Sequence, residues 1–462
     1  MMTAAVDASI FKAYDIRGIV DRTLTTDAVR LIGAALGAEA ADQGVREMVV
    51  GRDGRLSGPK LRDALVEGIR SSGTGVIDVG MVATPLLYFS THVLGTGSGV
   101  EITGSHNPPE YNGLKMMLAG ATLHGETIQK LRQRIERGLL PRAGQHGALR
   151  TADVREAYFQ RIGSDVKLAR PMKIAVDCGN GVAGAFAPAL YRRLGCEVIE
   201  LFCDVDGTFP NHHPDPAHPE NLQDLIRCLR ETGAEIGLAF DGDGDRLGVV
   251  TKDGHIIFPD RQMMLFARGV LKNNPGAEII FDVKCSRNLA REITAHGGRP
   301  TMWRTGHSLI KAKLKETGAP LAGEMSGHIF FNDRWPGFDD GMYAGARLLE
   351  LLSIERDPSA ALNALPDAVS TPELHLKTAE GENFALVERL QREAKFDSAR
   401  EVITIDGVRV EYADGFGLAR PSNTTPVLVL RFEADDAAAL ARIQTDFRRA
   451  LLAIKPDAKL PF

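Results

Sequence analysis

The sequence predicts an α/β protein with three similar α/β domains, each built on a mixed or parallel sheet, and a smaller C-terminal α+β domain. Three observations lead to this fold class. A chain of 462 residues is too long for one hydrophobic core. A pattern of alternating strands and helices repeats three times along most of the chain. Residues 402–432 alternate in strand fashion instead, and a helix is expected over 435–453.

The repeats follow an N-terminal segment of a different kind. Residues 11–18 are expected to form a polar and aromatic loop, and a helix is expected over 26–43. Each repeat opens with an apolar strand that ends at an aspartate, predicted at 48–53, 174–177 and 279–282. A helix (57–72, 183–194, 286–296), a second strand (76–79, 197–202, 300–304) and another helix (85–94, 222–232, 308–317) complete the pattern.

Each repeat then carries a polar loop followed by a short apolar strand. The loops are 103–108, 240–246 and 323–328, and the strands are 114–117, 247–250 and 329–331. Strands that alternate with helices form largely parallel sheets, and ligands collect at the carboxyl ends of such strands. We therefore expect three loops from equivalent places in three repeats to converge on one cleft.

Composition excludes several classes of protein. Charged residues make up 25% of the chain, the net charge is −5, and both signs are interspersed, so nucleic acid is not an expected partner. No apolar run approaches the roughly 20 residues that cross a bilayer, and the first ten residues do not resemble a signal peptide. The five cysteines are odd in number and have no Cys-x-x-Cys spacing, which indicates reduced thiols and a cytoplasmic location.

Two of the loops carry residues suited to catalysis or metal binding. Ser105 lies between glycine and histidine after an apolar strand, as a nucleophile would, although a polar turn explains the same residues. Asp241, Asp243 and Asp245 alternate with glycine, so three carboxylates can surround one hard cation. A solvated acidic turn is the alternative, but like charges this close favour a counter-ion, and oxygen ligands favour Mg²⁺.

Two further motifs have competing interpretations. The loop 420–425 offers Arg420, hydroxyls and backbone N–H groups suited to a phosphate, or it is a polar turn imposed by Pro421. Gly179, Gly181 and Gly184 have the spacing of a dinucleotide-binding turn, which would suit a nucleotide-binding regulator without catalytic activity. Two residues separate the strand from Gly179, and the other repeats lack such glycines, so a tight structural turn is favoured.

Five motifs in order resemble the α-D-phosphohexomutase superfamily, and within it the bacterial phosphomannomutase/phosphoglucomutase branch. They are Tyr-Asp-Ile-Arg-Gly from residue 14, Thr-Gly-Ser-His-Asn-Pro from 103, Asp-Gly-Asp-Gly-Asp-Arg from 241, Gly-Glu-Met-Ser-Gly-His from 323 and Arg-Pro-Ser-Asn-Thr from 420. The resemblance covers nearly the whole chain and implies four domains around a central cleft. We predict their limits as 1–151 with a phosphoserine loop, 152–256 with a metal loop, 257–368 with a sugar loop and 369–462 with a phosphate loop.

The resemblance also implies roles for individual residues. Ser105 would carry a phosphoryl group and join Asp241, Asp243 and Asp245 as a ligand of Mg²⁺. Arg246 would stabilise charge on the transferred group, and Lys115 and His106 are candidates to move the hydroxyl proton. Glu324 and Ser326 would bind the sugar 3- and 4-hydroxyls. The other implied substrate contacts are Met325 and Gly327 of the same loop, Arg420, Pro421, Ser422, Asn423 and Thr424 at the non-reacting phosphate, and Tyr14, Arg17, Lys284, His307 and His328 elsewhere in the cleft.

The implied reaction interconverts hexose 1-phosphate and hexose 6-phosphate, for glucose and mannose, through a hexose 1,6-bisphosphate such as glucose 1,6-bisphosphate. The partner would be a small phosphosugar, and we expect a monomer. One alternative is phosphoglucosamine mutase on the same fold, whose sugar loop tends to carry Gln where this chain has Met325. Another is a phosphatase of the haloacid-dehalogenase type, with Asp241 as nucleophile in an Asp-x-Asp motif.

Overall fold

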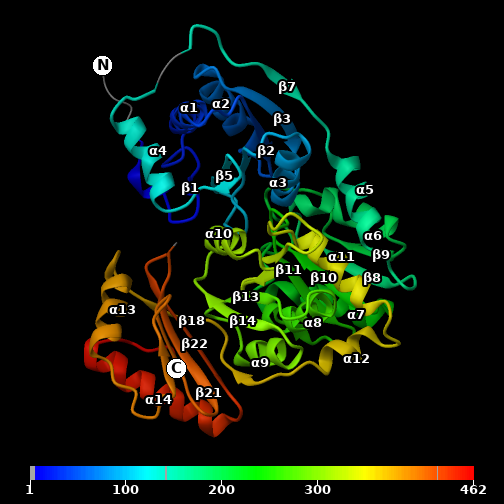
Figure 1. Ribbon diagram of the computed structural model, residues 1–462, viewed down its shortest axis with the longest axis vertical. Coiled ribbons are helices and arrows are strands. Elements are labelled where there is room, and N and C mark those ends of the chain that lie inside the picture. Colours follow the sequence, from blue (N-terminus) through cyan, green and yellow to red (C-terminus); the bar gives the residue numbers. More distant parts are fainter. Residues whose placement is uncertain (1–5, 141–142, 424) are drawn as a thin grey trace.

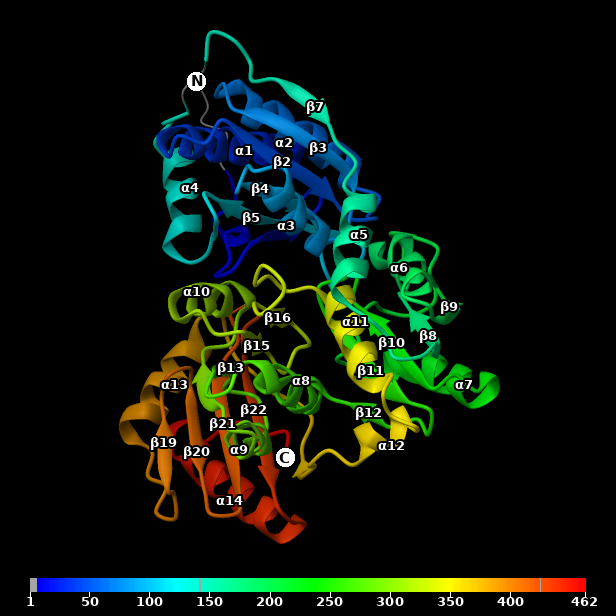
Figure 2. The same cartoon turned by 45° about the vertical axis from the view of Figure 1, so that its right-hand side comes forward.

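The computed structural model describes residues 6–140, 143–423 and 425–462. In these residues the strands form four sheets that follow one another along the chain (Figure 1). The first domain lies at one end of the long axis and the fourth at the other, with the second and third between them (Figures 1 and 2). The expected arrangement of three α/β domains and a smaller α+β domain is confirmed.

The first domain is built on a seven-stranded sheet of order β1-β5-β4-β2-β3-β7, with β6 paired to β5. Its strands are β1 Ile16–Ile19, β2 Glu47–Arg52, β3 Gly75–Met81, β4 Gly99–Ile102, β5 Tyr111–Leu118, β6 Ala121–Thr122 and β7 Leu149–Thr151. Its helices are the short η1 Ala8–Ile10, α1 Thr26–Asp42, α2 Gly58–Ser71, α3 Thr84–Val93 and α4 Glu126–Glu136.

The second and third sheets have the orders β12-β11-β10-β8-β9 and β14-β13-β15-β16. The second contains β8 Lys173–Asp177, β9 Glu197–Leu201, β10 Ile236–Phe240, β11 Leu247–Thr251 and β12 Ile256–Ile257, with α5 Arg155–Asp165, η2 Val182–Ala185, α6 Ala187–Arg193, η3 Pro219–Leu222 and α7 Gln223–Thr232. The third contains β13 Glu278–Asp282, β14 Arg299–Trp303, β15 Leu321–Gly323 and β16 Ile329–Phe331, with α8 Pro259–Asn273, α9 Arg287–Ala295, α10 His307–Thr317, α11 Gly341–Leu352 and α12 Pro358–Asn363.

The fourth domain is an antiparallel sheet of order β17-β22-β21-β20-β19, with β18 also paired to β22. Its strands are β17 Val369–Ser370, β18 Leu374–Lys377, β19 Glu401–Ile403, β20 Val408–Glu411, β21 Gly415–Pro421 and β22 Val427–Ala434, and its helices are α13 Glu382–Glu393 and α14 Ala437–Ile454. The predicted strands and final helix are confirmed, whereas β17, β18 and α13 were not predicted.

The internal repeat is confirmed by strand order. In each of the first three sheets the first strand of the repeat lies between the second and the third, all parallel, and the fourth is antiparallel to the third. The polar loops therefore occupy one topological position, after β4, β10 and β15 respectively. Because parallel strands end at the same edge of a sheet, each loop projects from the carboxyl edge of its own domain.

Two local expectations were wrong. The loop expected over 11–18 includes β1, which pairs antiparallel with β5 from Ile16 against Leu114 to Ile19 against Tyr111. The helix expected over 183–194 is broken at Phe186 into η2 and α6. In the first case a short stretch joins a sheet formed by residues far along the chain, which local pattern does not reveal.

The hydrophobic core does not divide cleanly at the predicted domain limits. One cluster of buried side chains joins α3 of the first domain to the second and third domains, through residues such as Leu86, Tyr158, Phe240 and Phe281. The first and fourth domains also have clusters of their own. Val283 packs with Phe416 and Leu418, which ties the fourth domain to the third. The limits given above for the four domains stay predictions.

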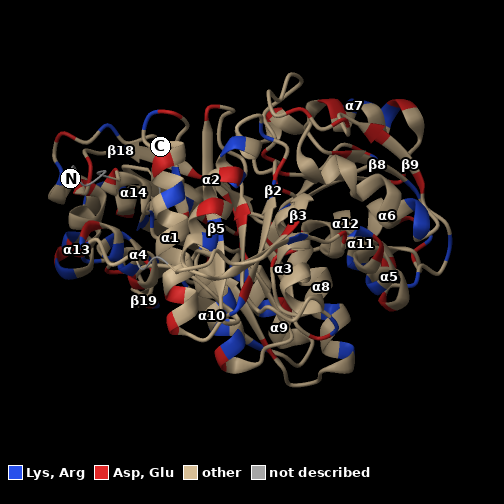
Figure 3. Ribbon diagram, turned by 90° about the horizontal axis from the view of Figure 1, so that it is seen from above, with Lys and Arg blue, Asp and Glu red and all other residues tan. Residues whose placement is uncertain are grey.

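The charges are distributed as the sequence suggested. Basic and acidic residues are interspersed over the ribbon in Figure 3. In the described part of the chain, no helix has both the length and the apolar character that crossing a bilayer requires.

Candidate active site

The predicted nucleophile, Ser105, is buried on the loop between β4 and β5 and has a left-handed backbone with φ of +48°. A serine rarely adopts this conformation, so the surrounding contacts have to hold it. Its backbone N–H donates to Oγ1 of Thr103 at 2.8 Å, and its Oγ lies 3.1 Å from Nδ1 of His106. The serine loop is thus stabilised by hydrogen bonds among its own residues.

Arg55, which the sequence analysis did not single out, fastens this loop. Its guanidinium donates to the carbonyl oxygens of Ser105 at 2.8 Å, Asn107 at 2.5 Å, Pro108 at 2.6 Å and Tyr111 at 3.0 Å. The side chain is only 1% exposed and lies 3.3 Å from the carboxylate of Asp53. A Cβ on Gly104 would lie 2.4 Å from this guanidinium, which explains the glycine before the serine.

The serine loop and the aspartate loop are in direct contact. Oγ of Ser105 donates to Oδ2 of Asp241 at 3.1 Å. A Cβ on Gly242 would lie 2.3 Å from the carbonyl oxygen of Ser105, so only glycine allows this approach. Thr84 at the start of α3 adds a second link, because its Oγ1 donates to Oδ2 of Asp243 at 2.6 Å. The first and second domains therefore meet at the two motifs that the sequence proposed as nucleophile and metal ligands.

The three aspartates form a compact buried cluster. Asp241, Asp243 and Asp245 each offer a carboxylate oxygen, and these oxygens all lie within 4.8 Å of one another. Oδ1 of Asp243 and Oδ1 of Asp245 are buried and have no hydrogen-bond partner among the described residues. Burial, together with the neighbouring carboxylates of Asp245 and Asp243, raises the pKa of Asp241 well above its ordinary value. Unpartnered carboxylate oxygens at this spacing fit a hard divalent cation.

Lys115 of β5 provides a positive charge at this cluster. Its Nζ donates to Oδ2 of Asp243 at 2.7 Å and also to Oδ2 of Asp245. Burial alone would lower the pKa of Lys115, but the carboxylates of Asp243, Asp245 and Asp241 raise it well above its ordinary value. The lysine is therefore a charged counter-ion of the aspartate cluster.

Arg246 and His328 join the aspartate loop to the loop of the third domain. Nε of Arg246 donates to Nε2 of His328 at 3.0 Å. Because a guanidinium Nε always carries hydrogen, the imidazole proton is on Nδ1, which faces Oδ2 of Asp339 at 3.0 Å. Asp245, His328 and Asp339 also have the spacing of metal ligands. These contacts join Arg246, His328 and Asp339 into a chain of polar groups beside the aspartate cluster.

The predicted sugar loop is fixed mainly through its own backbone. The carbonyl oxygen of His328 accepts from N–H of Glu324 at 2.9 Å, and Gly327 has a φ of +104° that favours glycine. Oγ of Ser326 donates to Oε2 of Glu324 at 3.1 Å. N–H of Met325 donates to Oδ1 of Asp282 at 3.2 Å.

His307 lies beside this loop, with its ring stacked on that of His328 at a centroid distance of 5.5 Å. Burial, with a further contribution from Lys311, holds the pKa of His307 well below its ordinary value. Glu324, by contrast, has a pKa raised by burial. The two histidines and Glu324 thus form the part of the site that the third domain contributes.

The predicted phosphate loop reaches the rest of the site through Tyr14. Oη of Tyr14 donates to the carbonyl oxygen of Thr305 at 2.8 Å, and Nδ2 of Asn423 donates to Oη of Tyr14. Nε of Arg420 lies 3.0 Å from Oδ2 of Asp406. Pro421 ends β21 and Ser422 follows it, while Thr424 lies outside the described residues.

The last two predicted contacts lie at opposite sides of the site. The guanidinium of Arg17 on β1 donates hydrogen bonds to the side chains of Asn107 and Asp15, so Arg17 contacts the serine loop. Nζ of Lys284 donates to Oε1 of Glu373 at 2.6 Å, near the start of the fourth domain. Among the described members of the predicted set, Arg17 therefore contacts the loop of Ser105, whereas Lys284 contacts the fourth domain.

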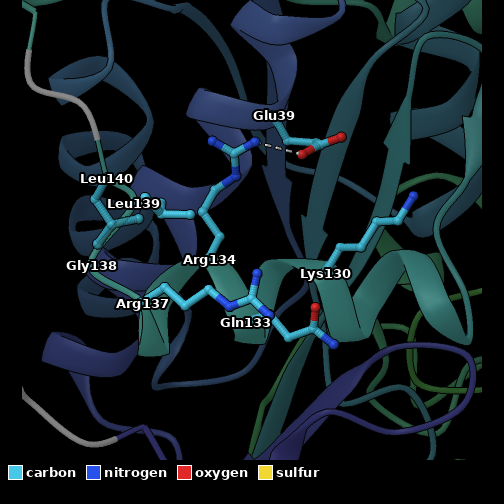
Figure 4. Close-up of a pocket in the computed structure, with 8 residues that line it drawn as sticks. All are labelled: Glu39, Lys130, Gln133, Arg134, Arg137, Gly138, Leu139 and Leu140. Carbon is cyan, nitrogen blue, oxygen red and sulfur yellow. Dashed lines mark hydrogen bonds and ion pairs between the residues drawn. The ribbon is translucent and has the colours of Figure 1, made fainter.

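A cavity of about 590 Å³ on the first domain is unrelated to these residues. Figure 4 shows it between α1 and α4, lined by Glu39, Lys130, Gln133, Arg134, Arg137, Gly138, Leu139 and Leu140. None of the predicted site residues lines it. The position of the loops and the chemistry of their side chains therefore locate the site better than cavity volume does.

Four side chains in the site were missed from the sequence: Arg55, Thr84, Lys311 and Asp339. Nζ of Lys311 lies 2.9 Å from Oδ1 of Asp339, so this ion pair lies next to the two histidines. Asp339 lies just before α11 and eight residues beyond the end of β16, so the pattern of aspartates at strand ends does not single it out. Nothing in the local sequence around Arg55 or Thr84 indicates their contacts.

The fold and the site together define a multidomain α/β enzyme in which loops from successive domains meet at a buried serine and three carboxylates. Sequence models of phosphoglucomutase/phosphomannomutase α/β/α domains I, II and III match residues 8–141, 156–254 and 258–369, and that of the C-terminal domain matches residues 373–450. The chain therefore belongs to the phosphoglucomutase/phosphomannomutase family.

Individual relatives agree with this assignment. A phosphoglucomutase of Neisseria meningitidis is 60% identical over 449 residues, which cover 97% of this chain and 98% of the relative. A phosphomannomutase/phosphoglucomutase of Pseudomonas aeruginosa is 56% identical over 456 residues, covering 98% of each chain. The crystal structure of a phosphoglucomutase/phosphomannomutase family protein from Burkholderia thailandensis is 61% identical, covers 99% of this chain and 100% of its own, and superposes with a TM-score of 0.95.

Proposed function

We propose that the protein interconverts the 1-phosphates and 6-phosphates of glucose and mannose through a phosphorylated Ser105. The observation that carries this proposal is the hydrogen bond of 3.1 Å from Oγ of Ser105 to Oδ2 of Asp241. It puts a buried hydroxyl nucleophile against three carboxylates that suit a divalent cation, the arrangement that phosphoryl transfer needs. The close relatives named phosphoglucomutase and phosphomannomutase/phosphoglucomutase support the same activity.

The reaction proceeds in two transfers. Phosphorylated Ser105 gives its phosphoryl group to the free hydroxyl of a bound hexose phosphate, so one serine P–O bond breaks and one sugar P–O bond forms. The resulting 1,6-bisphosphate turns end for end, and Ser105 attacks its other phosphorus. Each transfer takes one proton from the attacking hydroxyl to a base and returns one proton to the leaving oxygen. A hexose 1,6-bisphosphate such as glucose 1,6-bisphosphate would restore the phosphoserine whenever it is lost.

Positive charge for the transferred group would come from a bound cation and from Arg246. Asp241, Asp243 and Asp245 would hold Mg²⁺, which neutralises charge on the phosphoryl oxygens when it is bound. Arg246 is fixed by His328 and can donate to the same oxygens. Of the two candidates for moving the proton, His106 has a ring nitrogen 3.1 Å from Oγ of Ser105, whereas Lys115 is bonded to the aspartates. We therefore assign the proton at Ser105 to His106.

The remaining contacts would recognise the sugar and the other phosphate. Glu324 and Ser326 would bind the 3- and 4-hydroxyls, which glucose and mannose share, and leave the differing C2 without a contact. Arg420, Ser422 and Asn423 would bind the non-reacting phosphate, and Tyr14, Arg17, Lys284, His307 and His328 would complete the site. The phosphoglucosamine and dehalogenase-type alternatives are not favoured, because the close relatives are named for glucose and mannose and the domain models are those of this family.

A coupled turnover assay with MgCl₂ and a trace of hexose 1,6-bisphosphate tests this proposal. We expect comparable turnover of glucose 1-phosphate and mannose 1-phosphate, and little turnover of glucosamine 1-phosphate. Mass spectrometry of tryptic peptides after labelling with glucose 1,6-bisphosphate should find the phosphate on Ser105. A strong preference for glucosamine 1-phosphate, or phosphate on an aspartate that hydroxylamine removes, would overturn it.

We further propose that the protein works as a monomer in the cytoplasm. Four domains of one chain contribute to the site, so the chemistry requires no second copy. The five cysteines are all free thiols, which suits a reducing compartment. Size-exclusion chromatography with light scattering tests the monomer, and cell fractionation tests the location.

A further inference from the structure

Glu101 on β4 is a buried carboxylate that the proposed mechanism does not use. The side chain is fully buried, and neither Oε1 nor Oε2 has a hydrogen-bond partner among the described residues. Burial, followed by the carboxylates of Asp53 and Asp243, raises the pKa of Glu101 well above its ordinary value. An acidic side chain in such a position is costly unless another state of the protein gives it a partner.

The sheet leaves space for this carboxylate. Glu101 is paired with Gly51 on the neighbouring parallel strand β2. A Cβ on Gly51 would lie 2.4 Å from Oε2 of Glu101, so a larger residue at position 51 would collide with the carboxylate. The acidic group is thus accommodated by the strand beside it.

Lys115 of β5 lies directly opposite Glu101, on the side of β4 that faces away from β2. The two residues are cross-strand partners in the antiparallel pairing of β4 with β5, so their side chains leave the same face of the sheet. Cβ atoms of such partners lie about 4.5–5.5 Å apart. The ammonium of Lys115 is bonded to Asp243 and Asp245 rather than to Glu101. Its four-carbon stem is flexible enough to reach either set of carboxylates.

We propose that Glu101 receives the ammonium of Lys115 when a divalent cation occupies the three aspartates. This positioning role rests on the cation site of the proposed function. A divalent cation competes with Lys115 for the carboxylates of Asp243 and Asp245 and repels its positive charge. A buried ammonium that loses its partners is costly, and Glu101 is the cross-strand carboxylate that replaces them. The lysine then exchanges one carboxylate partner for another and stays inside the protein.

The exchange predicts that replacing Glu101 affects cation binding and folding stability in different ways. In the cation-free protein the Glu101 carboxylate has no hydrogen-bond partner in the described part of the chain, so Glu101→Gln should leave the unfolding midpoint in EDTA unchanged or higher. The apolar Glu101→Met, of similar size, should raise it. Both variants should bind Mg²⁺ about fivefold or more weakly, because the displaced lysine has no carboxylate to accept it. A residue needed only for packing would lower both stability and affinity.

Isothermal titration of the dephosphorylated full-length protein with MgCl₂, and thermal unfolding in EDTA, test this inference. Glu47→Gln, which alters a half-buried carboxylate of β2 in the same sheet, is the matched control and should change neither quantity. If both Glu101 variants bind Mg²⁺ as tightly as the wild type, the inference is overturned and the cation site stands. If the wild type itself binds no Mg²⁺, the proposed cation site fails first, and the inference fails with it.

Discussion

Tyr14 and Asn423 are hydrogen-bonded to each other although 409 positions separate them in the chain. The bond joins the segment before β1 to the loop after β21, and so links the first domain to the fourth. Oη of Tyr14 also donates to Thr305 in the third domain. One phenol group therefore connects three domains at the side of the site where we place the non-reacting phosphate.

Tyr14→Phe removes both polar contacts and keeps the ring. Each hydrogen bond contributes about 0.5–1.5 kcal/mol, so we expect kcat/KM for glucose 1-phosphate to fall about threefold to tenfold, mostly through KM. Steady-state kinetics measures the change. Tyr111→Phe, on β5, offers a conservative control. A Tyr14→Phe enzyme with wild-type KM would show that this contact does not shape the phosphate side of the site.

Ser105→Ala should abolish turnover while the fold is retained. Removing a nucleophile that acts with several partners costs about 10³-fold or more in kcat. Labelling with hexose 1,6-bisphosphate should leave the protein at its unmodified mass. Ser326→Ala is the comparison, with an increase in KM as the expected result. Residual phosphorylation of the Ser105→Ala protein would place the phosphoryl group on another residue.

Arg55→Ala should destabilise the protein although it touches no substrate. The substitution leaves Asp53 buried without its cation and frees four carbonyl oxygens of the serine loop, so the free energy of unfolding should fall by about 3–5 kcal/mol. Urea unfolding measures it. Arg30→Ala, which removes two exposed ion pairs, should cost less than about 1 kcal/mol. Equal losses in the two variants would contradict the role of Arg55 as the anchor of the loop.

Lys115→Met should make folding stability depend on the divalent cation. Without the ammonium, three buried carboxylates face one another, so we expect a lower melting temperature in EDTA and a larger increase on adding MgCl₂ than in the wild type. Differential scanning calorimetry at several MgCl₂ concentrations measures both. If MgCl₂ shifts the two proteins equally, the lysine is not the counter-ion of the cluster.

Glu373 should contribute to stability in a manner that depends on pH. Partial desolvation of this partly exposed side chain would raise its pKa, but Lys284 outweighs this and lowers the pKa of Glu373 to about 2. Because the pKa in the folded state lies below the ordinary value, the stabilisation is present above about pH 4.5 and is lost as the pH falls toward 2. The difference in unfolding free energy between the wild type and Glu373→Gln should therefore shrink over this interval in urea titrations. A difference independent of pH would exclude the ion pair as its source.

The sequence predicted the repeating scaffold well because hydrophobic periodicity and glycine positions are local. The strands ending near Asp177 and Asp282 and the loops around Ser105 and Asp243 all follow from neighbouring residues. Contacts between domains are not local. Arg55 contacts Ser105, 50 positions away, and Thr84 contacts Asp243, 159 positions away. Asp339 also contacts partners that only the fold brings close, so no spacing rule reveals these three residues. The roles of the site residues came from a resemblance and stay predictions until the experiments above are done.

The common strand order of the first three sheets bears on how such a molecule can arise and vary. Duplication of a single ancestral unit would supply three copies of the same sheet, each with a free loop after its third strand. Divergence of that loop alone would then give the loop with Ser105 in one copy, the three aspartates in the next and the loop with Glu324 and Ser326 in the third. The three sheets thus share one strand order while their loops differ, so no domain can replace another whose loop is altered.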